Sequence, residues 1–214
     1  MSRYPQVLFQ NRKPKRINTL EEYCQSGGYQ ALANVLRGYT PQGVCAAVQE
    51  AGLRGRGGAG FPAAKKWESV PTDGAFPRFL VANSDEMEPG TFKDRVLIHA
   101  DPHAIIEGIA IAAYTIQASK AFIFVRPNYE GSAAILEREI KRAEEAGYLG
   151  KRILGSDFSL EIIVHLSGGR YICGEGTALL NALMGKRPNP IKPPPYPTVR
   201  SEEHTSELQS PYVI

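Results

Sequence analysis

The stretch GLRGRGGAG at residues 52–60 holds five glycines in nine positions, and FPAAKKW follows directly. Glycine costs roughly 0.5–1 kcal/mol relative to alanine inside regular structure, so a folded chain keeps such a run where its backbone must approach another group. Without a Cβ in the way, successive N–H groups can line a concavity that accepts phosphate oxygens. Arg54, Arg56, Lys65 and Lys66 place positive charge around the loop. The stretch therefore predicts a cradle for a phosphorylated cofactor.

Two well-known phosphate loops do not fit the surroundings of this stretch. Residues 55–60 satisfy the pattern G-x-G-x-x-G, but the dinucleotide fingerprint also needs a preceding strand and an acidic residue about 20 positions later. Here Thr40 and Pro41 predict a helix start, and Val44 and Val48 recur at helical spacing toward the loop. The Gly-Lys-Ser/Thr ending of the Walker loop is also absent. A helix before the loop thus argues against the dinucleotide fingerprint.

Apolar strand-like and helix-like segments alternate after the loop. Short strands are expected at residues 78–82, 121–125 and 160–165, and helices at residues 62–69, 102–119, 131–146 and 177–184. Before the loop, short helices are expected at residues 19–26, 29–36 and 40–51, and Thr19 with Glu22 three residues later predicts a capping box for the first of them. This order predicts an α/β sandwich with a mainly parallel sheet, preceded by a short helical N-terminal segment.

The composition is that of a soluble globular chain. The 214 residues are 43% hydrophobic and 22% charged, and a net charge of +3 is too weak to indicate nucleic-acid binding. The most apolar run, residues 104–116, is too short to span a bilayer and contains Glu107, so a buried helix and no direct membrane insertion are expected. The first residues lack a secretory signal, and the three cysteines show no C-x-x-C spacing. These features predict a cytoplasmic chain without a metal site of its own.

The last residues differ in character from the rest. The segment RSEEHTSELQS at residues 200–210 is polar and has no hydrophobic period. It also matches the translation of a common sequencing-adapter sequence. We therefore expect residues 200–214 to be a non-native tail, and the chain before it to be a truncated piece of a longer protein.

Three segments carry the candidate chemistry: the glycine loop, NSDEMEPG at residues 83–90, and GGRYICGEGTA at residues 168–178. In α/β sheets, ligands bind where strands end. The glycine loop offers N–H donors and cations, whereas the second segment offers acceptors in Asn83, Asp85, Glu86 and Glu88. Acceptors suit the hydroxyls of a ribityl chain and the carboxamide of a nicotinamide. A donor-rich wall facing an acceptor-rich wall predicts a nucleotide or flavin site.

These motifs closely resemble those of the NADH-binding flavoprotein of respiratory complex I, the NADH:quinone oxidoreductase. The resemblance rests on GLRGRGGAGFP with the following KW, on NSDEMEPG, and on RYICGEGTAL at residues 170–179, and it covers nearly all of residues 6–198. It implies a Rossmann-like, FMN- and NADH-binding domain over residues 52–199, after an arm and helices in residues 1–51. Diaphorase subunits of NAD-linked hydrogenases and of formate dehydrogenases share the same motifs.

The resemblance also implies a mechanism. FMN lies in the cavity, NADH stacks on it, and a hydride passes to flavin N5. Electrons then leave one at a time for iron–sulfur clusters and finally quinone. No side chain is expected to be catalytic in its own right, because the protein orients the rings and the cofactor reacts. The family's [4Fe–4S] domain would lie beyond this chain, in the full-length protein. The implied partners are other complex I subunits, especially the [2Fe–2S] thioredoxin-like one, at the periphery of the inner membrane.

The site residues follow from the resemblance by position. The residues that it assigns to phosphate are Gly55, Arg56, Gly57, Gly58 and Lys66. The residues that it assigns to FMN are Asn83, Asp85, Glu86, Gly174, Glu175 and Thr177. NADH contacts are implied for Glu88 at the nicotinamide, for Phe61 and Tyr196 at the adenine, and for Tyr171.

One cofactor-binding position departs from the family pattern. Gly176 stands where the family usually has a second glutamate that approaches NADH, so two explanations stay open: an altered nucleotide affinity, or a paralogue. Two other functions stay open for the chain as a whole. It could be a diaphorase of a hydrogenase or formate dehydrogenase, or an inactive, truncated nucleotide-binding fragment.

Overall fold

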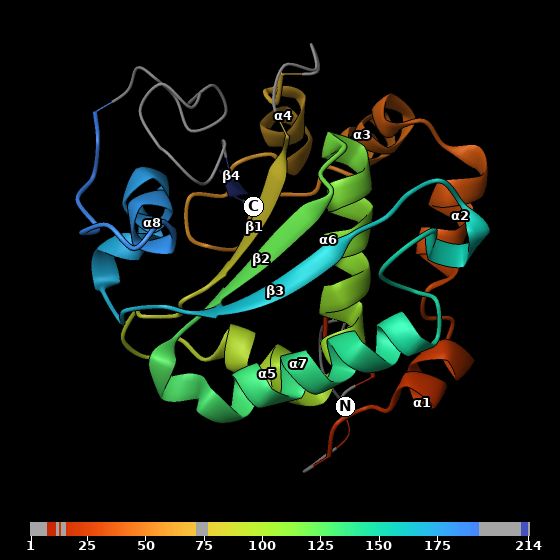
Figure 1. The fold of residues 1–214 in the computed structure, drawn as a ribbon, viewed down its shortest axis with the longest axis horizontal. Coiled ribbons are helices and arrows are strands. Elements are labelled where there is room, and N and C mark those ends of the chain that lie inside the picture. Colours follow the sequence, from red (N-terminus) through yellow and green to blue (C-terminus); the bar gives the residue numbers. More distant parts are fainter. Residues whose placement is uncertain (1–7, 12, 14–15, 72–76, 193–210, 214) are drawn as a thin grey trace.

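A parallel β-sheet lies at the centre of the computed structural model, which describes residues 8–11, 13, 16–71, 77–192 and 211–213 (Figure 1). Its strands are β1 (Phe79–Ser84), β2 (Lys120–Val125), β3 (Glu161–Leu166) and the short β4 (Pro211–Val213), in the order β3-β2-β1-β4. All the strand pairs are parallel. In the register, Ser84 faces Val125 and Val125 faces Leu166, so the three long strands end level.

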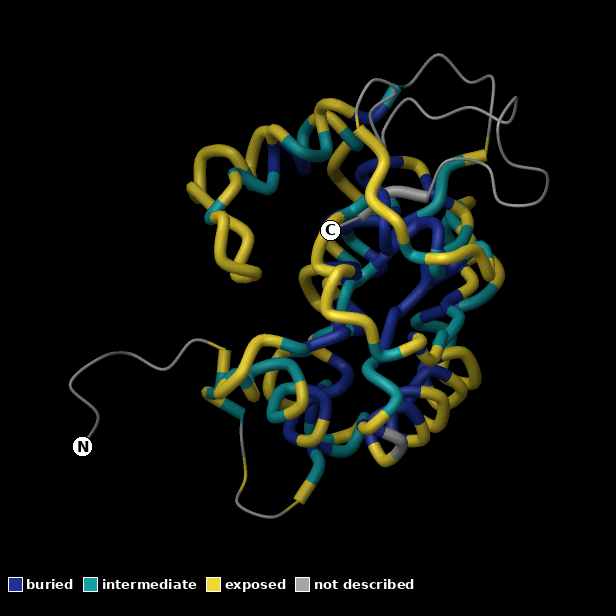
Figure 2. The backbone as a smooth tube through the Cα atoms, turned by 90° about the vertical axis from the view of Figure 1, so that its left-hand side faces the viewer, coloured by how far each residue is buried: buried dark blue, intermediate teal, exposed yellow. Residues whose placement is uncertain are grey.

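Helices cover both faces of this sheet. Alternate side chains of a strand point to opposite faces: Leu80 of β1 packs into the core beside α6 (Pro102–Ile116) and α7 (Glu130–Glu145), whereas Val81 packs with Leu179 of α8 (Gly176–Leu183). Figure 2 shows the buried backbone at the centre and exposed segments around it. The α/β sandwich predicted from the sequence is confirmed.

The N-terminal helical segment is also confirmed. It consists of α1 (Leu20–Gln25), α2 (Gln30–Gly38) and α3 (Pro41–Glu50), and α4 (Ala63–Glu68) follows the glycine loop. Thr19 and Glu22 form the predicted reciprocal capping box of α1. Thr40 caps α3 by accepting from the Gly43 amide, with Pro41 at the first helical position.

Most other predicted elements occur with small shifts of their ends. Helix α6 stops at Ile116, three residues before the predicted end, because Gln117 adopts a left-handed conformation with φ of 58° and closes the helix. Helix α5 (Lys93–Ala100) was not predicted. Short 3-10 turns, η1 (Pro127–Tyr129), η2 (Ile153–Gly155) and η3 (Tyr171–Gly174), complete the elements that Figure 1 colours along the described chain.

The apolar run predicted to be a buried helix forms most of α6, which is largely buried. Among the residues that the structure describes, no single helix has both the length and the apolar character needed to cross a membrane. Helices α5 and α6 have the required length and apolar character only when they are taken together, and the chain bends by 104° between them. Residues 200–210 and 214 of the expected foreign tail lie outside the described residues, and residues 211–213 form β4.

Candidate functional site

The level carboxyl ends of β1, β2 and β3 bring Asp85, Arg126 and Ser167 to neighbouring positions, each one residue past its strand. The Arg126 amide donates to the Ser84 carbonyl at 3.4 Å, and the Ser167 amide donates to the Val125 carbonyl at 2.8 Å. Hydrogen bonding across the sheet thus continues beyond the last paired residues. This edge is where a sheet of this type binds ligands.

Asp85 is the most unusual group at this edge. Its side chain is buried, and both carboxylate oxygens lack a hydrogen-bond partner among the described residues. Burial raises the pKa of Asp85, while the nearby Ser167 hydroxyl, which falls short of hydrogen-bond geometry, and the Arg126 charge act in the opposite direction. Because a buried carboxylate without partners is costly, the arrangement suits a ligand that brings hydroxyl donors.

Glu86 is turned away from that position, toward α5. Its carboxylate accepts from the Asp94 amide at 3.0 Å and from the Arg95 amide at 3.5 Å, and the Tyr129 hydroxyl donates to it at 3.4 Å. Phe92, the N-terminal flanking residue of α5, makes no side-chain capping bond, so Glu86 acts as the cap. The role of Glu86 as an FMN ligand stays a prediction.

Hydrogen bonds join the segments that follow β1 and β3. The Tyr171 hydroxyl donates to a Glu88 oxygen at 2.5 Å, and both residues are exposed. This bond, followed by the charge of Glu88, raises the pKa of Tyr171. The Asn83 side-chain amide donates to the Cys173 carbonyl at 3.1 Å, and its oxygen accepts from the Asp85 amide. Two of the three predicted site segments therefore lie in direct contact.

The N-terminus of α8 is capped from within its own segment. The Glu175 carboxylate accepts from the Thr177 and Ala178 amides at 3.1 and 2.9 Å, and from the Thr177 hydroxyl at 2.5 Å. Partial burial opposes ionisation of Glu175, but these hydrogen bonds outweigh it and lower the pKa of the group. Gly176 is the first residue of α8, and Gly174 ends η3 in an exposed position.

The glycine loop is closed at its base and open at its tip. The Gly55 amide donates to the Phe61 carbonyl at 2.9 Å, and the Arg54 guanidinium donates to the Gly60 carbonyl at 3.2 Å. Gly58 has a φ of 114°, a conformation that side chains rarely adopt, and a Cβ added there would meet nothing within 4 Å. Gly57 is likewise open, so the exposed tip leaves room for a ligand against the backbone.

The other residues predicted around this loop have different exposures. Lys66, on α4, is half-buried, and burial lowers the pKa of its amine. Within the described ranges it forms no ion pair. Arg56 is exposed, Phe61 is 55% exposed, and Tyr196 lies outside the described residues. That the loop faces the segment after β1 across one cavity stays a prediction.

Sequence reasoning missed Arg126, Tyr129 and Ser167. Arg126 and Ser167 carry no recognisable motif, and Tyr129 reaches Glu86 only because η1 turns back toward the sheet. The signal that could have found Arg126 and Ser167 is position, since Arg126 directly follows one predicted strand and Ser167 lies two residues past the end of another.

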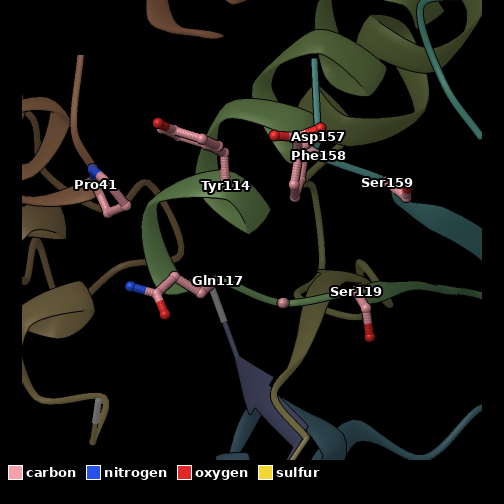
Figure 3. A pocket seen from close by; sticks show the side chains of 8 residues that line it. Pro41, Tyr114, Gln117, Ser119, Asp157, Phe158 and Ser159 are labelled. Carbon is pink, nitrogen blue, oxygen red and sulfur yellow. The ribbon is translucent and has the colours of Figure 1, made fainter. Parts of the chain in front are cut away.

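A separate cavity of about 360 Å³ lies at the opposite, amino edge of the sheet (Figure 3). Ser119 directly precedes β2, and Ser159 lies just before β3. Its lining residues are Pro41, Tyr114, Gln117, Ala118, Ser119, Asp157, Phe158 and Ser159. Of the predicted site residues that the structure describes, none lines this cavity.

Comparison with known proteins places the carboxyl edge in context. Residues 48–202 match a family model described as the Nuo51 FMN-binding domain. The chain is 48% identical over 192 residues to the F subunit of the NADH-quinone oxidoreductase of Aquifex aeolicus (strain VF5), covering 89% of this chain and 44% of that protein. It is 46% identical over 187 residues to the F subunit of the Escherichia coli (strain K12) enzyme, covering 87% of this chain and 42% of that protein.

A solved structure agrees with these matches. A crystal structure of an NAD⁺-reducing [NiFe]-hydrogenase in the H₂-reduced state superposes with a TM-score of 0.74 and 34% identity, over 92% of this chain and 33% of that one. The chain thus spans under half the length of the curated relatives named above. Because the family model matches more than half of its residues, this chain belongs to the family of the Nuo51 FMN-binding domain of complex I.

Proposed function

We propose that this chain is the FMN-holding part of a flavoprotein that oxidises NADH. The observation that carries the proposal is the buried, unpartnered Asp85 carboxylate at the carboxyl edge of the sheet. A polar group in that state is costly unless a ligand completes its hydrogen bonds. The family's description supplies the ligand, a flavin nucleotide with a hydroxyl-bearing chain.

The residues present fit the two ends of FMN. Asp85 would accept from ribityl hydroxyls, and the open amides near Gly57 and Gly58 would donate to the phosphate. Lys66, half-buried and without an ion pair within the described ranges, would balance the phosphate charge. The chemistry that FMN supplies when bound is acceptance of a hydride from NADH and release of electrons one at a time.

NADH would bind beside Glu88 and Tyr171. Glu88 is suited to accept from the nicotinamide carboxamide, but the Tyr171 hydroxyl already donates to it. Binding of the nucleotide therefore exchanges one hydrogen bond of Glu88 for another, which keeps the cost of ligand binding small. Phe61, 55% exposed, offers an aromatic surface for adenine. Gly176 supplies no carboxylate at the start of α8, and we propose that nucleotide affinity differs from that of the family for this reason.

In the intact protein, electrons would continue to a [4Fe–4S] cluster held beyond this chain and to a [2Fe–2S] thioredoxin-like partner, with quinone as the final acceptor. Such an assembly would be cytoplasmic and peripheral to the inner membrane. A diaphorase of a hydrogenase is the second candidate, favoured by the 0.74 TM-score with an NAD⁺-reducing hydrogenase. Because the chain spans under half of its relatives, catalysis by this chain alone is expected to be poor.

Flavin titration of the whole 214-residue chain tests the proposal. FMN should bind weakly, and its fluorescence should be quenched when it binds. NADH should bleach the yellow colour of the bound flavin without reduction of added quinone. Lys66→Gln should weaken FMN binding by about 10- to 150-fold while leaving riboflavin binding unchanged, because a lost charge-assisted hydrogen bond costs about 1.5–3 kcal/mol. Lys65→Gln, one residue away and exposed, is the matched control.

The nucleotide half of the proposal needs its own variant. Glu88→Gln should slow bleaching by NADH and leave FMN affinity unchanged. Loss of FMN binding in Glu88→Gln would contradict the assignment of Glu88 to NADH rather than to FMN. If the chain binds neither FMN nor NADH, it is an inactive nucleotide-binding fragment, and if it reduces quinone rapidly, the part of its relatives that it does not span matters less than proposed.

A further inference from the structure

Arg126 holds the main chain on both sides of Asp85. Its amide donates to the Ser84 carbonyl at 3.4 Å, and its guanidinium Nη1 donates to the Glu86 carbonyl at 2.9 Å. Ser84 precedes Asp85 and Glu86 follows it. One residue at the end of β2 therefore brackets the residue at the end of β1 that bears the unpartnered carboxylate.

Arg126 is itself fixed by Tyr129. The guanidinium carbon of Arg126 lies 5.5 Å from the centre of the Tyr129 ring, and that of Arg95 lies 5.3 Å from the same centre. The Tyr129 amide donates to the Arg126 carbonyl at 2.9 Å, and its hydroxyl donates to Glu86 at 3.4 Å. These contacts order the Arg126 guanidinium, so less conformational entropy is lost when it forms its hydrogen bond.

The groups that face Asp85 come from every element at this edge. Arg126, directly after β2, contributes the positive charge, and Ser167 after β3 contributes a hydroxyl. Burial raises the pKa of the Cys173 thiol in η3, and the nearby charge of Asp85 raises it further. Glu86 directs its carboxylate away to α5. The cation beside Asp85 is therefore the residue that also holds its backbone.

We infer that Arg126, held by Tyr129, is a positioning residue that fixes the strand-end backbone around Asp85 and so holds the carboxylate at the cofactor edge. This inference rests on the proposed function. It also gives Glu86 a definite role, because its main-chain carbonyl receives the arginine while its carboxylate caps α5. The start of α5 and the carboxylate of Asp85 then depend on one network.

The test compares Arg126→Met and Arg126→Lys with Arg78→Met in the 214-residue chain. Arg78 is the matched control, because its Nη1 also donates to a carbonyl, that of Ile116 at 3.3 Å, but at the opposite end of β1. The titration of the Asp85 carboxyl carbon is followed by ¹³C NMR, and FMN binding by fluorescence quenching. Arg126→Met should raise the pKa of Asp85 and weaken FMN binding about tenfold, since the lost bond involves a charged donor.

Arg126→Lys separates positioning from charge, and it replaces the methionine variant if that variant fails to fold. Lysine keeps the charge but not the planar fork, so the pKa of Asp85 should move less than in Arg126→Met while FMN affinity still falls. An unchanged Asp85 titration in Arg126→Met, parental FMN affinity in Arg126→Lys, or equal losses in Arg78→Met would each overturn the inference. If the parent binds no FMN, the proposed function fails for this chain, whereas a parental Asp85 titration in Arg126→Met still overturns the inference.

Discussion

The carboxyl edge of the sheet buries Asp85, and the junction between the N-terminal helices and α6 buries Glu107, but of these two carboxylates only Glu107 has hydrogen-bond partners. Glu107 of α6 accepts from the Tyr29 and Leu32 amides at 2.9 Å each, and from the Tyr23 hydroxyl at 2.5 Å. Asp85 has no partner for either oxygen among the described residues. The completed set of hydrogen bonds indicates a structural role for Glu107, whereas the two unpaired oxygens of Asp85 require an explanation, for which we propose a ligand.

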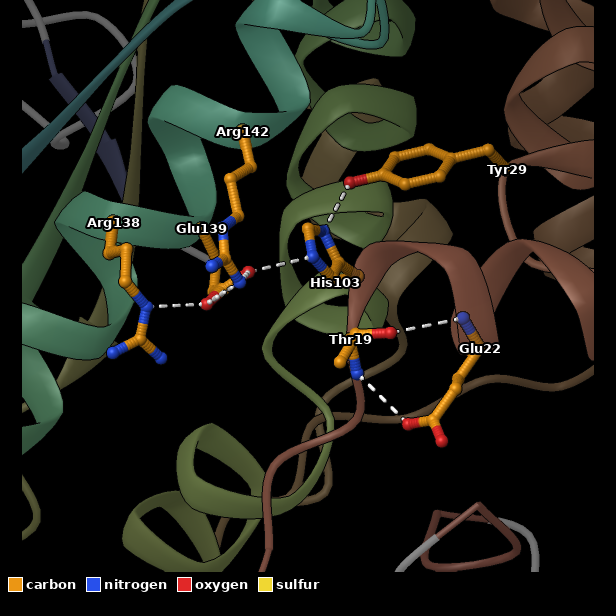
Figure 4. A network of polar contacts seen from close by, with 7 residues as sticks. All are labelled: Thr19, Glu22, Tyr29, His103, Arg138, Glu139 and Arg142. Carbon is orange, nitrogen blue, oxygen red and sulfur yellow. Dashed lines mark hydrogen bonds and ion pairs between the residues drawn. The ribbon is translucent and has the colours of Figure 1, made fainter.

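The junction contains a second complete network around His103 (Figure 4). His103 lies 3.0 Å from the Tyr29 hydroxyl through Nδ1 and 3.1 Å from Glu139 through Nε2. Because a carboxylate only accepts, Nε2 carries the proton and Nδ1 accepts from Tyr29. Arg138 and Arg142 donate to the same Glu139. A carboxylate, imidazole and hydroxyl in series resemble a catalytic relay, but His103 and Tyr29 are fully buried, so no substrate can reach them.

The largest expected effect is on the free energy of unfolding when Glu107 at the junction is replaced. Glu107→Ala leaves two amides and a hydroxyl without their acceptor, so the free energy of unfolding should fall by about 3–5 kcal/mol. Urea denaturation followed by circular dichroism measures it. Glu144→Ala, an exposed position on α7, should change the value by less than about 0.5 kcal/mol. A loss below about 1 kcal/mol in Glu107→Ala would contradict the structural role assigned to this network.

Protonation of His103 provides the next test. Burial lowers the pKa of His103 more than the charge and hydrogen bond of Glu139 raise it. The unfolded chain then binds the proton more readily, so the free energy of unfolding should fall as pH drops below the ordinary value of 6.5. One such proton contributes a slope of at most about 1.4 kcal/mol per pH unit.

The variant for this test is His103→Gln, which can donate to Glu139 and accept from Tyr29 but cannot titrate. The groups that face His103 are Tyr23, Tyr29, Asp101, Glu139 and Arg142. They are the same in parent and variant, so the difference between the two stability curves isolates His103. Parallel curves between about pH 5 and 7 would show that His103 does not titrate differently in the folded state.

The same contrast explains what the sequence could predict. Thr19 and Thr40 were found as helix caps because their partners lie within three residues, and the strands were found because apolar runs are local patterns. Helix α5 was missed because its cap, Glu86, lies seven residues before its first residue, Lys93, in the segment that follows β1. Capping rules that read neighbouring residues cannot detect such a partner.

The sequence predicted candidate site residues, but it did not predict that the carboxylates of Asp85 and Glu86 point in different directions. The acidic segment suggested that Asp85 and Glu86 act together, yet the fold turns one carboxylate toward an edge without partners and the other toward α5. Which way each points depends on where the chain leaves β1, a tertiary property. Arg126 was missed for the same reason, because only strand register places it beside Asp85.

The smallest expected effect is that of Asp85→Asn, which should raise the free energy of unfolding, whereas Glu107→Ala should lower it. Burial raises the pKa of Asp85 in the folded chain above its ordinary value of 3.8, so folding disfavours the ionised carboxylate. The protonated carboxyl therefore contributes stability at low pH, and this contribution is lost as the pH rises through the pKa of the folded state. At neutral pH, Asp85→Asn should therefore raise the free energy of unfolding by about 1 kcal/mol. The same substitution should weaken FMN binding, because it removes the carboxylate that we propose accepts from the ribityl hydroxyls. A group kept for binding is often kept at the expense of stability. Asp157→Asn, exposed on the far edge, is the control and should change neither quantity. A loss of stability in Asp85→Asn would mean that this carboxylate is a structural group like Glu107, and the contrast between the two regions would disappear.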